Sequence, residues 1–384
     1  MNNRNKIAIF CRNLTGGGCE RVLVNLANSL VERGLKVDFV LSKAEGILLN
    51  QLSAQVKIID LQGKSLNNNS FSLPFSFQST TSFPNLIKYL RKEQPEVILA
   101  ASHYCNEFAI LAKHFIFSST KVIVSEHTTL SQEAKNSNYR SSRFSPITAR
   151  LLYPWANGII AVSKGVSQDL AQITGLSTEK IQVIYNPVIT PELKKASKAT
   201  VTHPWFMEGE LPIILGVGRL VPQKDFPSLI RAFSQVEKTT PCRLVILGDG
   251  REKKALQALI HELGLDDKVA LLGFVDNPYA YLAKASVFVL SSLYEGLPTV
   301  LIEAMAVKTP LVSTVCPSGP KEILNDGEYG DLVDVGDIES MSQAILRILS
   351  GNIKPIDTDW LNQFSLENAT QNYLDYLGSI IKAT

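Results

Sequence analysis

Short apolar segments alternate with longer amphipathic segments along most of the chain. The amphipathic segments carry apolar residues at helical spacing, as Val22, Leu26 and Leu30 do within residues 20–33. Alternation of strands with helices is typical of parallel sheets, so we predict an α/β fold. The predicted strands are 6–10, 37–41, 97–100, 121–125, 158–162, 181–184, 213–217, 243–247, 269–272, 287–291 and 310–313. The predicted helices are 20–33, 167–174, 226–238, 252–263, 278–285, a segment that begins at 300, and 366–381.

The alternation is interrupted once and then restarts, which indicates two domains. A chain of 384 residues exceeds a typical single domain. Asn186-Pro187 ends the first series, and the charged, proline-containing stretch 190–212 is the expected linker. We predict an N-terminal Rossmann-like domain over 1–190 and a C-terminal Rossmann-like domain over 191–365. A final helix within 366–384 could pack back on the N-terminal domain.

Charge is distributed unevenly although the whole chain is close to neutral. The net charge is +2, but residues 1–190 hold 20 Lys and Arg against 12 Asp and Glu, and residues 191–384 hold 18 against 24. A basic half favours an anionic partner such as a lipid surface, a diphosphate or nucleic acid. A chance bias of a well-solvated surface would give the same counts.

The cysteines and the N-terminus indicate the compartment. The five cysteines include no C-x-x-C pair, so neither a disulfide framework nor a structural zinc site is expected. The first apolar segment ends at Cys11-Arg12 and is too short for a signal peptide. No stretch approaches the ~18 apolar residues of a membrane span. We expect a cytoplasmic protein that could touch a membrane surface.

Residues 67–83 form an unusual polar stretch that carries Phe71, Phe75, Phe77 and Phe83. A long loop inside a domain requires a physical reason. Either the aromatic side chains contact an acceptor or a membrane, or they anchor a surface loop to its own domain. We favour the second interpretation.

A glycine-rich turn lies between the first predicted strand and the first predicted helix. Gly16, Gly17 and Gly18 follow one another there. Backbone N–H groups at such a turn, together with the helix dipole, favour an anion. The pattern is not G-x-G-x-x-G, which disfavours a dinucleotide-dependent dehydrogenase. Glycine-rich turns also occur for packing alone.

A second turn follows the predicted strand 213–217. Gly218 is followed by Arg219, and Lys224 stands five residues later. Ligands of α/β sheets bind at the carboxyl ends of strands. Two cations at this edge would suit a diphosphate leaving group, although two solvated loop cations are the simpler interpretation.

Two glutamates in residues 295–303 form the strongest signal. Gly296 and Pro298 predict a sharp turn after strand 287–291, and proline suits the first turn of a helix. The N–H groups of residues 299–301 would then be free to point into the crevice. Glu295 in the loop could address a sugar while Glu303 in the helix accepts from a ribose. A capping or solvated glutamate is the alternative, which the apolar LPTVLI sequence between them disfavours.

These motifs, taken in order, resemble the retaining glycosyltransferases of family 4, which have the GT-B fold. The matching segments are 16–22 (GGGCERV), 125–128 (SEHT), 161–167 (AVSKGVS), 183–187 (VIYNP), 216–224 (GVGRLVPQK), 247–250 (LGDG), 272–274 (LGF), 292–306 (SLYEGLPTVLIEAMA) and 316–324 (CPSGPKEIL). The resemblance implies two Rossmann-like domains facing across a deep cleft. The N-terminal domain would bind the acceptor, and the C-terminal domain would bind the nucleotide sugar.

The resemblance also assigns roles to single residues. It implies that the glycine-rich loop closes over the donor, that Arg219 and Lys224 hold its diphosphate, and that Glu303 binds the ribose. Glu295 would contact the sugar near its reacting carbon, and His127 would lie near the hydroxymethyl end. The implied catalytic residues are Glu295, His127, Arg219 and Lys224. The implied nucleotide-sugar-binding residues are Gly16, Gly17, Gly18, Gly218, Arg219, Lys224, Gly273, Phe274, Glu295, Gly296, Leu297, Pro298, Thr299 and Glu303.

Segment 316–324 resembles the subgroup that builds bacterial surface polysaccharides and lipid-linked glycans. It implies transfer of a hexose or N-acetylhexosamine, with retention, from a nucleotide-diphosphate sugar, expected to be a UDP-sugar. The acceptor would be a growing polysaccharide, a lipopolysaccharide or an undecaprenyl-diphosphate-linked glycan. Because cations and a helix end could carry the leaving charge, we expect no metal and no other cofactor. One departure from the family is Asn186-Pro187-Val188, where Asn-Gly is common.

Three other functions were considered, and the sequence disfavours the second and the third. A UDP-sugar 2-epimerase shares the fold, although nothing marks acid and base groups for chemistry at C2. A non-catalytic protein that binds the donor or a lipid and supports another transferase is disfavoured by the intact set of charged motif residues. Nucleic acid is not an expected partner, because aromatic-plus-basic stripes are not evident. The expected location is the inner face of the cytoplasmic membrane, as a peripheral protein on an anionic surface.

Overall fold

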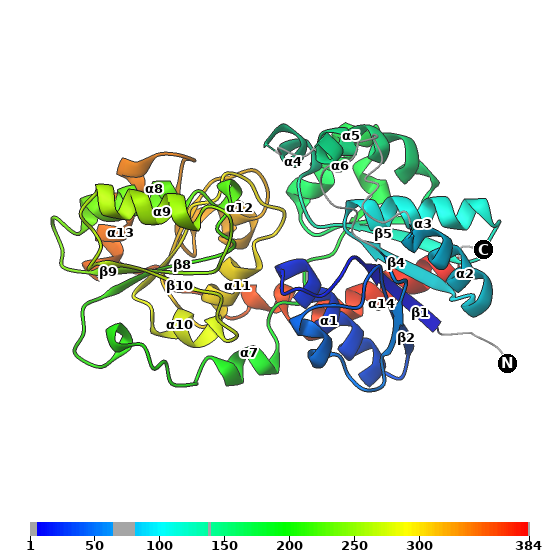
Figure 1. Cartoon of the computed structure of the whole chain (residues 1–384), viewed down its shortest axis with the longest axis horizontal. Coiled ribbons are helices and arrows are strands. Elements are labelled where there is room, and N and C mark those ends of the chain that lie inside the picture. Colours follow the sequence, from blue (N-terminus) through cyan, green and yellow to red (C-terminus); the bar gives the residue numbers. More distant parts are fainter. Residues whose placement is uncertain (1–5, 64–80, 137–139, 383–384) are drawn as a thin grey trace. The chain divides into compact units, whose positions relative to one another are not determined.

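The computed structural model describes residues 6–63, 81–136 and 140–382, and it divides the chain into two compact units (Figure 1). Unit 1 is Met1–Pro187 together with Gln363–Thr384, and unit 2 is Val188–Asn362. Each unit contains one parallel sheet with helices packed against it. The predicted α/β class with two Rossmann-like halves is therefore confirmed. The observed divisions follow residues 187 and 362, where the expected ones followed 190 and 365.

The sheet of unit 1 has the order β3-β2-β1-β4-β5-β6-β7. All of its neighbouring strands pair in parallel. The strand order reverses between β1 and β4, which opens a crevice at their carboxyl ends. The strands are β1 (Lys6–Cys11), β2 (Lys36–Leu41), β3 (Lys57–Asp60), β4 (Val97–Ala101), β5 (Lys121–Glu126), β6 (Gly158–Ala161) and β7 (Ile181–Val183).

The first and last helices of unit 1 bury apolar side chains in the core that includes this sheet. The core joins β1, β2 and β4 to the inner faces of the first and last helices. The helices are α1 (Gly18–Glu32), α2 (Ser82–Glu93), α3 (His103–Phe115), α4 (Leu130–Asn136), α5 (Arg140–Leu152), α6 (Lys164–Thr174) and α14 (Leu366–Lys382), with short 3-10 turns η1 (Ile47–Gln51), η3 (Tyr153–Trp155) and η4 (Thr178–Lys180).

Helix α14, at the end of the chain, is part of unit 1 and runs beside α1 (Figure 1). Tyr373 and Leu377 are buried in the core of this unit. Thr370 Oγ1 donates to Ser29 Oγ at 3.0 Å, and Tyr376 Oη accepts from the N–H of Ile159 at 3.1 Å. Burial of these side chains holds the C-terminal helix in place.

The sheet of unit 2 has the order β10-β9-β8-β11-β12-β13, and it is also parallel throughout. Its strands are β8 (Ile213–Val217), β9 (Arg243–Leu247), β10 (Val269–Gly273), β11 (Val287–Leu290), β12 (Leu311–Thr314) and β13 (Asp331–Val333). Its helices are α7 (Pro191–Ala196), α8 (Phe226–Val236), α9 (Lys253–Glu262), α10 (Pro278–Lys284), α11 (Thr299–Ala306), α12 (Pro320–Ile323) and α13 (Ile338–Leu349), with 3-10 turns η5 (Pro204–Phe206), η6 (Pro222–Lys224) and η7 (Asn325–Gly327). The 3-10 turn η8 (Trp360–Phe364) spans the division between the two units.

Residues 190–212, expected to be the linker and the entry to the second half, fold as part of unit 2. Thr190 caps α7, and its Oγ1 accepts from the N–H of Leu193 at 3.1 Å. Leu193, Val201 and Phe206 are buried. The charges of this stretch face solvent while its apolar side chains pack inward. Composition alone does not reveal that separation.

Other differences concern elements that the apolar pattern missed. Strands β3 and β13 were not predicted, and both lie at sheet edges, where a strand needs no continuous apolar run. Helices α2, α3, α5 and α13 were also missed. Most of the expected loop 67–83 lies outside the described residues. Its last member, Phe83, stands in α2 rather than in a loop, and its ring contacts Phe108 edge-on, with centroids 5.2 Å apart.

Candidate active site

The strand order of unit 2 reverses between β8 and β11, so the loops after these strands diverge. A crevice at the carboxyl ends of two such strands is where open α/β sheets bind ligands. The loop after β8 carries Gly218, Arg219 and Lys224, and the loop after β11 carries Glu295. The topology thus brings together two motifs that stand 71 residues apart in sequence.

Lys224 and Glu295 form a nearly buried ion pair in this crevice. Lys224 Nζ lies 2.6 Å from Glu295 Oε1, and the two side chains are 14% and 8% exposed. Ser292 Oγ donates to the same carboxylate oxygen at 2.6 Å. Charge-assisted hydrogen bonds of this kind are short and strong. The pair holds an ammonium and a carboxylate side by side at the binding edge of the sheet.

Further hydrogen bonds join the same two loops. Ser291 Oγ donates to the carbonyl of Lys224 at 2.7 Å, and Gln223 Nε2 donates to the carbonyl of Tyr294 at 2.9 Å. The N–H of Leu293 donates to the carbonyl of Gln223 at 2.8 Å. The position of Lys224 is therefore determined by backbone contacts as well as by its charge.

Three glycine turns lie beside this crevice in close backbone contact, at Gly218, Gly248 and Gly273. Gly248 has φ +135°, and a Cβ atom there would lie 1.9 Å from the carbonyl oxygen of Gly218. The N–H of Gly248 donates to the carbonyl of Gly273 at 2.7 Å. Only glycine fits this approach. Arg219 follows Gly218, Phe274 follows Gly273, and both side chains are exposed.

The start of α11 differs from expectation in one respect. The N–H of Leu301 donates to the carbonyl of Pro298 at 3.1 Å, so the expectation that residues 299–301 all have free N–H groups is wrong for residue 301. A tight first turn satisfies this donor within the helix. Glu303 is buried in α11. Ser318 Oγ donates to the carbonyl of Gly296 at 2.7 Å and supports the turn.

The glycine-rich loop of unit 1 follows β1 and is already bonded to a carboxylate. Glu20 Oε2 accepts from the N–H groups of Gly16 at 2.7 Å and Gly17 at 3.1 Å. Gly16 has φ +116°, which favours glycine. The expectation that these N–H groups stand open for an anion is therefore corrected: an anion must compete with Glu20 for them. Gly18 begins α1.

His127 follows β5 and carries a neutral ring at pH 7. Burial lowers the pKa of His127 to about 4. Its Nε2 lies 3.1 Å from Ser125 Oγ, and its buried Nδ1 has no hydrogen-bond partner among the residues that the structure describes. The uncharged ring can donate one hydrogen bond and accept another.

A buried network beside His127 was not found by sequence reasoning. Tyr153 Oη donates to Glu126 Oε2 at 2.7 Å, and Asn106 Nδ2 donates to Tyr153 Oη at 3.0 Å. Burial and the Glu126 carboxylate raise the pKa of Tyr153 well above its usual value. Burial, with Glu20 and Glu126 nearby, also raises the pKa of Cys19. Glu126 directly follows the predicted strand 121–125, and a carboxylate at the end of a buried strand was the available signal.

The site residues expected from the sequence are distributed over both units. Unit 1 holds Gly16, Gly17, Gly18 and His127. Unit 2 holds the others, and there the structure brings together the glycine turns, the Lys224–Glu295 pair and the start of α11. These others are Gly218, Arg219, Lys224, Gly273, Phe274, Glu295, Gly296, Leu297, Pro298, Thr299 and Glu303.

Two family models match most of the chain. The model described as Glycosyltransferase Family 4 matches residues 16–191, and the model described as Glycosyl transferases group 1 matches residues 203–360. The two matches correspond to the two units, except that the first ends four residues after Pro187.

Relatives of known name and a solved structure agree with these models. The N-acetylgalactosamine-N,N'-diacetylbacillosaminyl-diphospho-undecaprenol 4-alpha-N-acetylgalactosaminyltransferase of Campylobacter jejuni is 33% identical over 347 residues, which are 90% of each chain. The lipopolysaccharide core biosynthesis glycosyltransferase LpsE of Rhizobium meliloti is 29% identical, covering 94% of this chain and 96% of its own. Anabaena HepE, solved with UDP and glucose, has a TM-score of 0.75 at 19% identity, covering 98% of this chain and all of its own.

Proposed function

Because this chain belongs to the glycosyltransferases of family 4 with the GT-B fold, we propose that it moves a hexose or N-acetylhexosamine from a UDP-sugar to a lipid-linked or growing polysaccharide glycan. The observation that carries the proposal is the Lys224–Glu295 ion pair at the strand reversal of unit 2. A cation and a carboxylate held there suit an anionic diphosphate joined to a sugar.

Arg219 and Lys224 hold the donor diphosphate in this mechanism, and Glu303 accepts hydrogen bonds from the ribose. Glu295 contacts the sugar near its anomeric carbon. The bond between that carbon and the diphosphate oxygen breaks while a bond to the acceptor hydroxyl forms, with net retention. The departing diphosphate oxygen takes the acceptor proton. The two cations stabilise the charge that develops on the leaving group.

The resemblance to the family assigns His127 and the glycine-rich loop of unit 1 to the donor as well. The ring donates to or accepts from sugar hydroxyls without adding charge, because its lowered pKa keeps it unprotonated at pH 7. Gly16 and Gly17 exchange the Glu20 carboxylate for a donor oxygen when the donor binds. An anion can therefore bind the N–H groups of this loop only if their hydrogen bonds to Glu20 break.

The donor and acceptor classes come from the relatives. Anabaena HepE was solved with UDP and glucose, and the name of the Campylobacter jejuni relative specifies a diphospho-undecaprenol acceptor. A lipid-linked acceptor would bring this chain to the inner face of the cytoplasmic membrane. Within the residues that the structure describes, no helix has the length and apolarity that crossing a bilayer requires.

We propose that transfer needs no divalent metal. Arg219, Lys224 and the start of α11 supply the positive charge that a metal would otherwise bring. One Asp-x-Asp sequence, Asp357-Thr358-Asp359, does occur, and it forms an exposed turn in which Asp357 Oδ1 accepts from the N–H of Asp359 at 2.8 Å. It lies outside the motif segments that carry the proposed site.

Donor turnover tests the proposal. Purified protein is incubated with UDP- and GDP-sugars, with and without membrane extract, with and without EDTA, and nucleotide release is measured. We expect release from one UDP-sugar that requires extract and is indifferent to EDTA. The anomeric configuration of the product, measured by NMR, should equal that of the donor.

Variant Glu295→Gln serves as the control and should lose turnover while it still binds UDP. Release from no donor despite tight UDP binding would contradict transferase activity and favour a non-catalytic partner. A donor epimer formed without acceptor would instead indicate an epimerase. Loss of activity in EDTA that is restored by a divalent metal would contradict the metal-free mechanism alone.

A further inference from the structure

Helix α5 packs against unit 1 mainly through small side chains and leaves several large apolar ones exposed. Its inner positions include Ser145, Thr148 and Ala149, all buried. The two hydroxyls are bonded within the helix, because Ser145 Oγ donates to the carbonyl of Ser142 at 2.6 Å and Thr148 Oγ1 to the carbonyl of Ser145 at 3.1 Å. Ser145, Thr148, Ala149 and Leu152 therefore face the core, while Phe144, Ile147 and Leu151 remain exposed.

The outer face carries large apolar side chains at helical spacing. Phe144, Ile147, Leu151 and Trp155, the last in η3, are between 41% and 63% exposed. Their positions advance by three, four and four residues, so they share one side of the helix. Contiguous exposed apolar residues on a globular protein mark an interaction site. These four residues with Arg143 and Arg150 are called the α5 stripe below.

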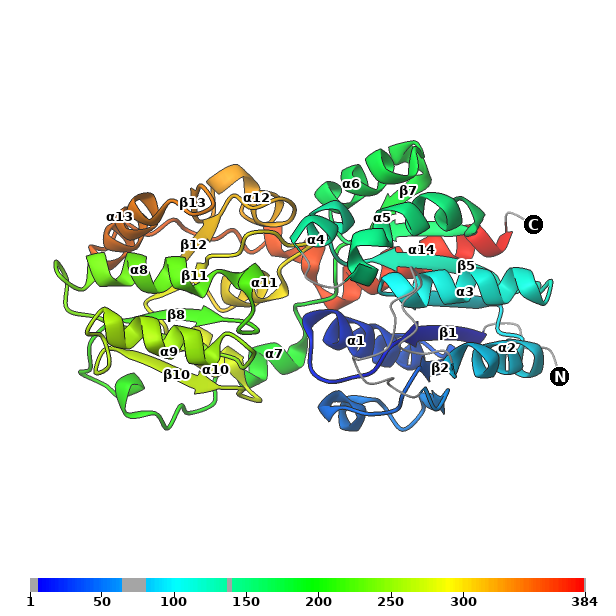
Figure 2. The ribbon, with the colours of Figure 1, turned by 45° about the horizontal axis from the view of Figure 1, so that its top comes forward.

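The α5 stripe is basic as well as apolar. Arg143 and Arg150 are exposed at positions adjacent to Phe144 and Leu151. The sequence has no Asp or Glu between Glu133 and Asp169. Basic residues beside bulky apolar ones on one helix face are typical of segments that lie in the headgroup region of a membrane. Helix α5 packs beside α4 and α6 (Figure 2). The residues of this face are exposed.

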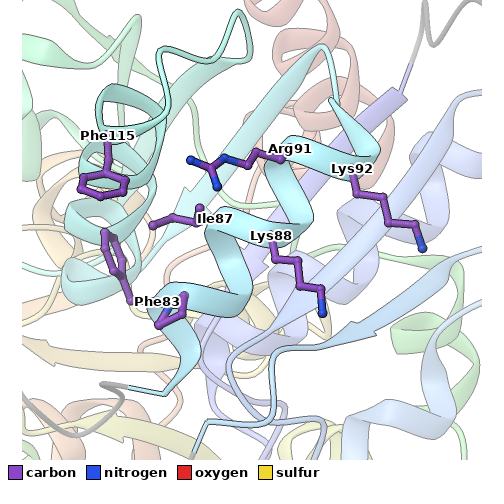
Figure 3. A pocket seen from close by; sticks show the side chains of 7 residues that line it. Phe83, Ile87, Lys88, Arg91, Lys92 and Phe115 are labelled. Atoms are coloured by element: carbon purple, nitrogen blue, oxygen red, sulfur yellow. The ribbon is translucent and has the colours of Figure 1, made fainter.

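Exposed aromatic and basic side chains continue the stripe onto α3 and α2. The ring of Trp155 contacts His114 edge-on at 5.4 Å, and Phe115 and Phe117, which follow His114, are 68% and 95% exposed. Phe115 borders a groove whose other side is α2 (Figure 3). Arg91 reaches over that groove toward Phe115, and Lys88 and Lys92 of the same helix also line it (Figure 3).

We propose that the α5 stripe, continued by the end of α3 and the cations of α2, is the surface by which unit 1 docks on an anionic lipid bilayer. The inference rests on the proposed function, since a lipid-linked acceptor requires the enzyme to work at a membrane. The positive charge of the stripe favours an anionic bilayer over a second copy of this chain as the binding partner. A symmetric pairing of two stripes would bring the same arginines together, whereas anionic headgroups neutralise them.

Vesicle flotation tests the proposal with the full chain. The vesicles are phosphatidylcholine alone or mixed with about one third phosphatidylglycerol. The wild type should float with the mixed vesicles at low salt and less so at high salt, because salt screens the surface charge. The double variant Ile147→Glu/Leu151→Glu should lose at least about tenfold in vesicle affinity, and each change of Arg143 or Arg150 to Gln about fivefold.

A control variant adds the same charge elsewhere. Met207 and Ile353 lie in unit 2 and are 51% and 53% exposed. The double variant Met207→Glu/Ile353→Glu should float like the wild type. An equal loss in both double variants would show that only net charge matters and would overturn the proposal. So would unchanged flotation of the Ile147→Glu/Leu151→Glu variant.

Two further measurements distinguish lipid docking from self-association and from damage to the catalytic site. Sedimentation of the Ile147→Glu/Leu151→Glu variant should show the same oligomeric state as the wild type. A shift from dimer to monomer would overturn lipid docking in favour of self-association. Turnover of the donor with an acceptor soluble in water should stay within about twofold of wild type, because surface substitutions away from the site act locally. Donor inactivity of the wild type together with intact flotation would refute the proposed function and leave the docking surface standing.

Discussion

Replacing Lys224 with Met removes the cation from the candidate site while keeping most of its volume. The side chain that loses its partner is Glu295, which is 8% exposed and would keep the hydrogen bond from Ser292. Removing one member of a buried ion pair leaves an uncompensated charge and costs about 3–5 kcal/mol. Because both side chains keep some solvent contact, we take the lower end, about 3 kcal/mol.

Unit 2 should therefore unfold at a lower temperature in Lys224→Met. For a domain of its size, each kcal/mol lowers Tm by about 2–4 °C, so the expected decrease is about 6–12 °C. Differential scanning calorimetry measures it, and a transition that belongs to unit 1 should not move. The variant Glu295→Gln should cost a similar amount, since it leaves the ammonium of Lys224 without its counter-ion.

The double variant Lys224→Met/Glu295→Gln distinguishes an ion pair from two independent residues. If the charges stabilise each other, the double variant should lose about as much stability as either single one. The pairing argument would be refuted if the stability losses of the two single variants added up in the double variant. It would also be refuted if the Tm of Lys224→Met fell by less than about 2 °C, which corresponds to about one kcal/mol. Donor turnover should fall about 10²–10³-fold in Lys224→Met if the cation stabilises the leaving diphosphate.

Three further predictions concern other parts of the two units. The pKa of His127 is lowered to about 4, so the folded state favours the neutral ring. The free energy of unfolding should therefore be unaffected by this group above about pH 6.5, and should decrease by at most about 3 kcal/mol as the pH drops to about 4. The free energy of unfolding of His127→Gln, measured with urea over this pH range, should not show the decrease that is due to His127. Gly248→Ala should destabilise the protein by more than about 3 kcal/mol and weaken UDP binding, because its Cβ would overlap the carbonyl of Gly218. The control Gly264→Ala, which has open space and φ +66°, should destabilise by about 1 kcal/mol. Calorimetry measures the stability of both variants, and titration measures their UDP binding. Glu20→Ala should destabilise unit 1 by about 1 kcal/mol in the same calorimetric measurement, since it removes the acceptor of two N–H groups, and an unchanged Tm would contradict that role.

Much of the fold was predictable because buried parallel strands require continuous apolar segments. The central strands β1, β4, β8 and β11 have such segments, and the structure confirms them within one residue at each end. Edge strand β3 reads KIID and is largely exposed, so it produces no comparable signal. Helix α5 was missed for a different reason: three of its large apolar residues face outward, and apart from Leu152 its buried positions hold small side chains.

The candidate site was predictable in its members and not in its contacts. Arg219, Lys224, Glu295 and Glu303 were proposed as members because their motifs resemble those of a known family, and these assignments stay predictions. Sequence spacing could not show that Lys224 and Glu295 bond to each other, since they stand 71 residues apart on loops joined only by the order of the sheet. Glu20 was overlooked because a capping glutamate and a free one look alike in a sequence.

The sequence by itself determined the alternation of strands and helices, the restart of that alternation in the second half, and the residue types able to bind a diphosphate. These properties are local, since they depend on side-chain polarity and on the conformations that glycine and proline permit. The tertiary structure alone decided which N–H groups are already bonded, which charges are paired and which apolar side chains stay outside. Those outcomes depend on burial and on contacts between distant segments, because a charge or an apolar group gains or loses free energy according to what surrounds it after folding.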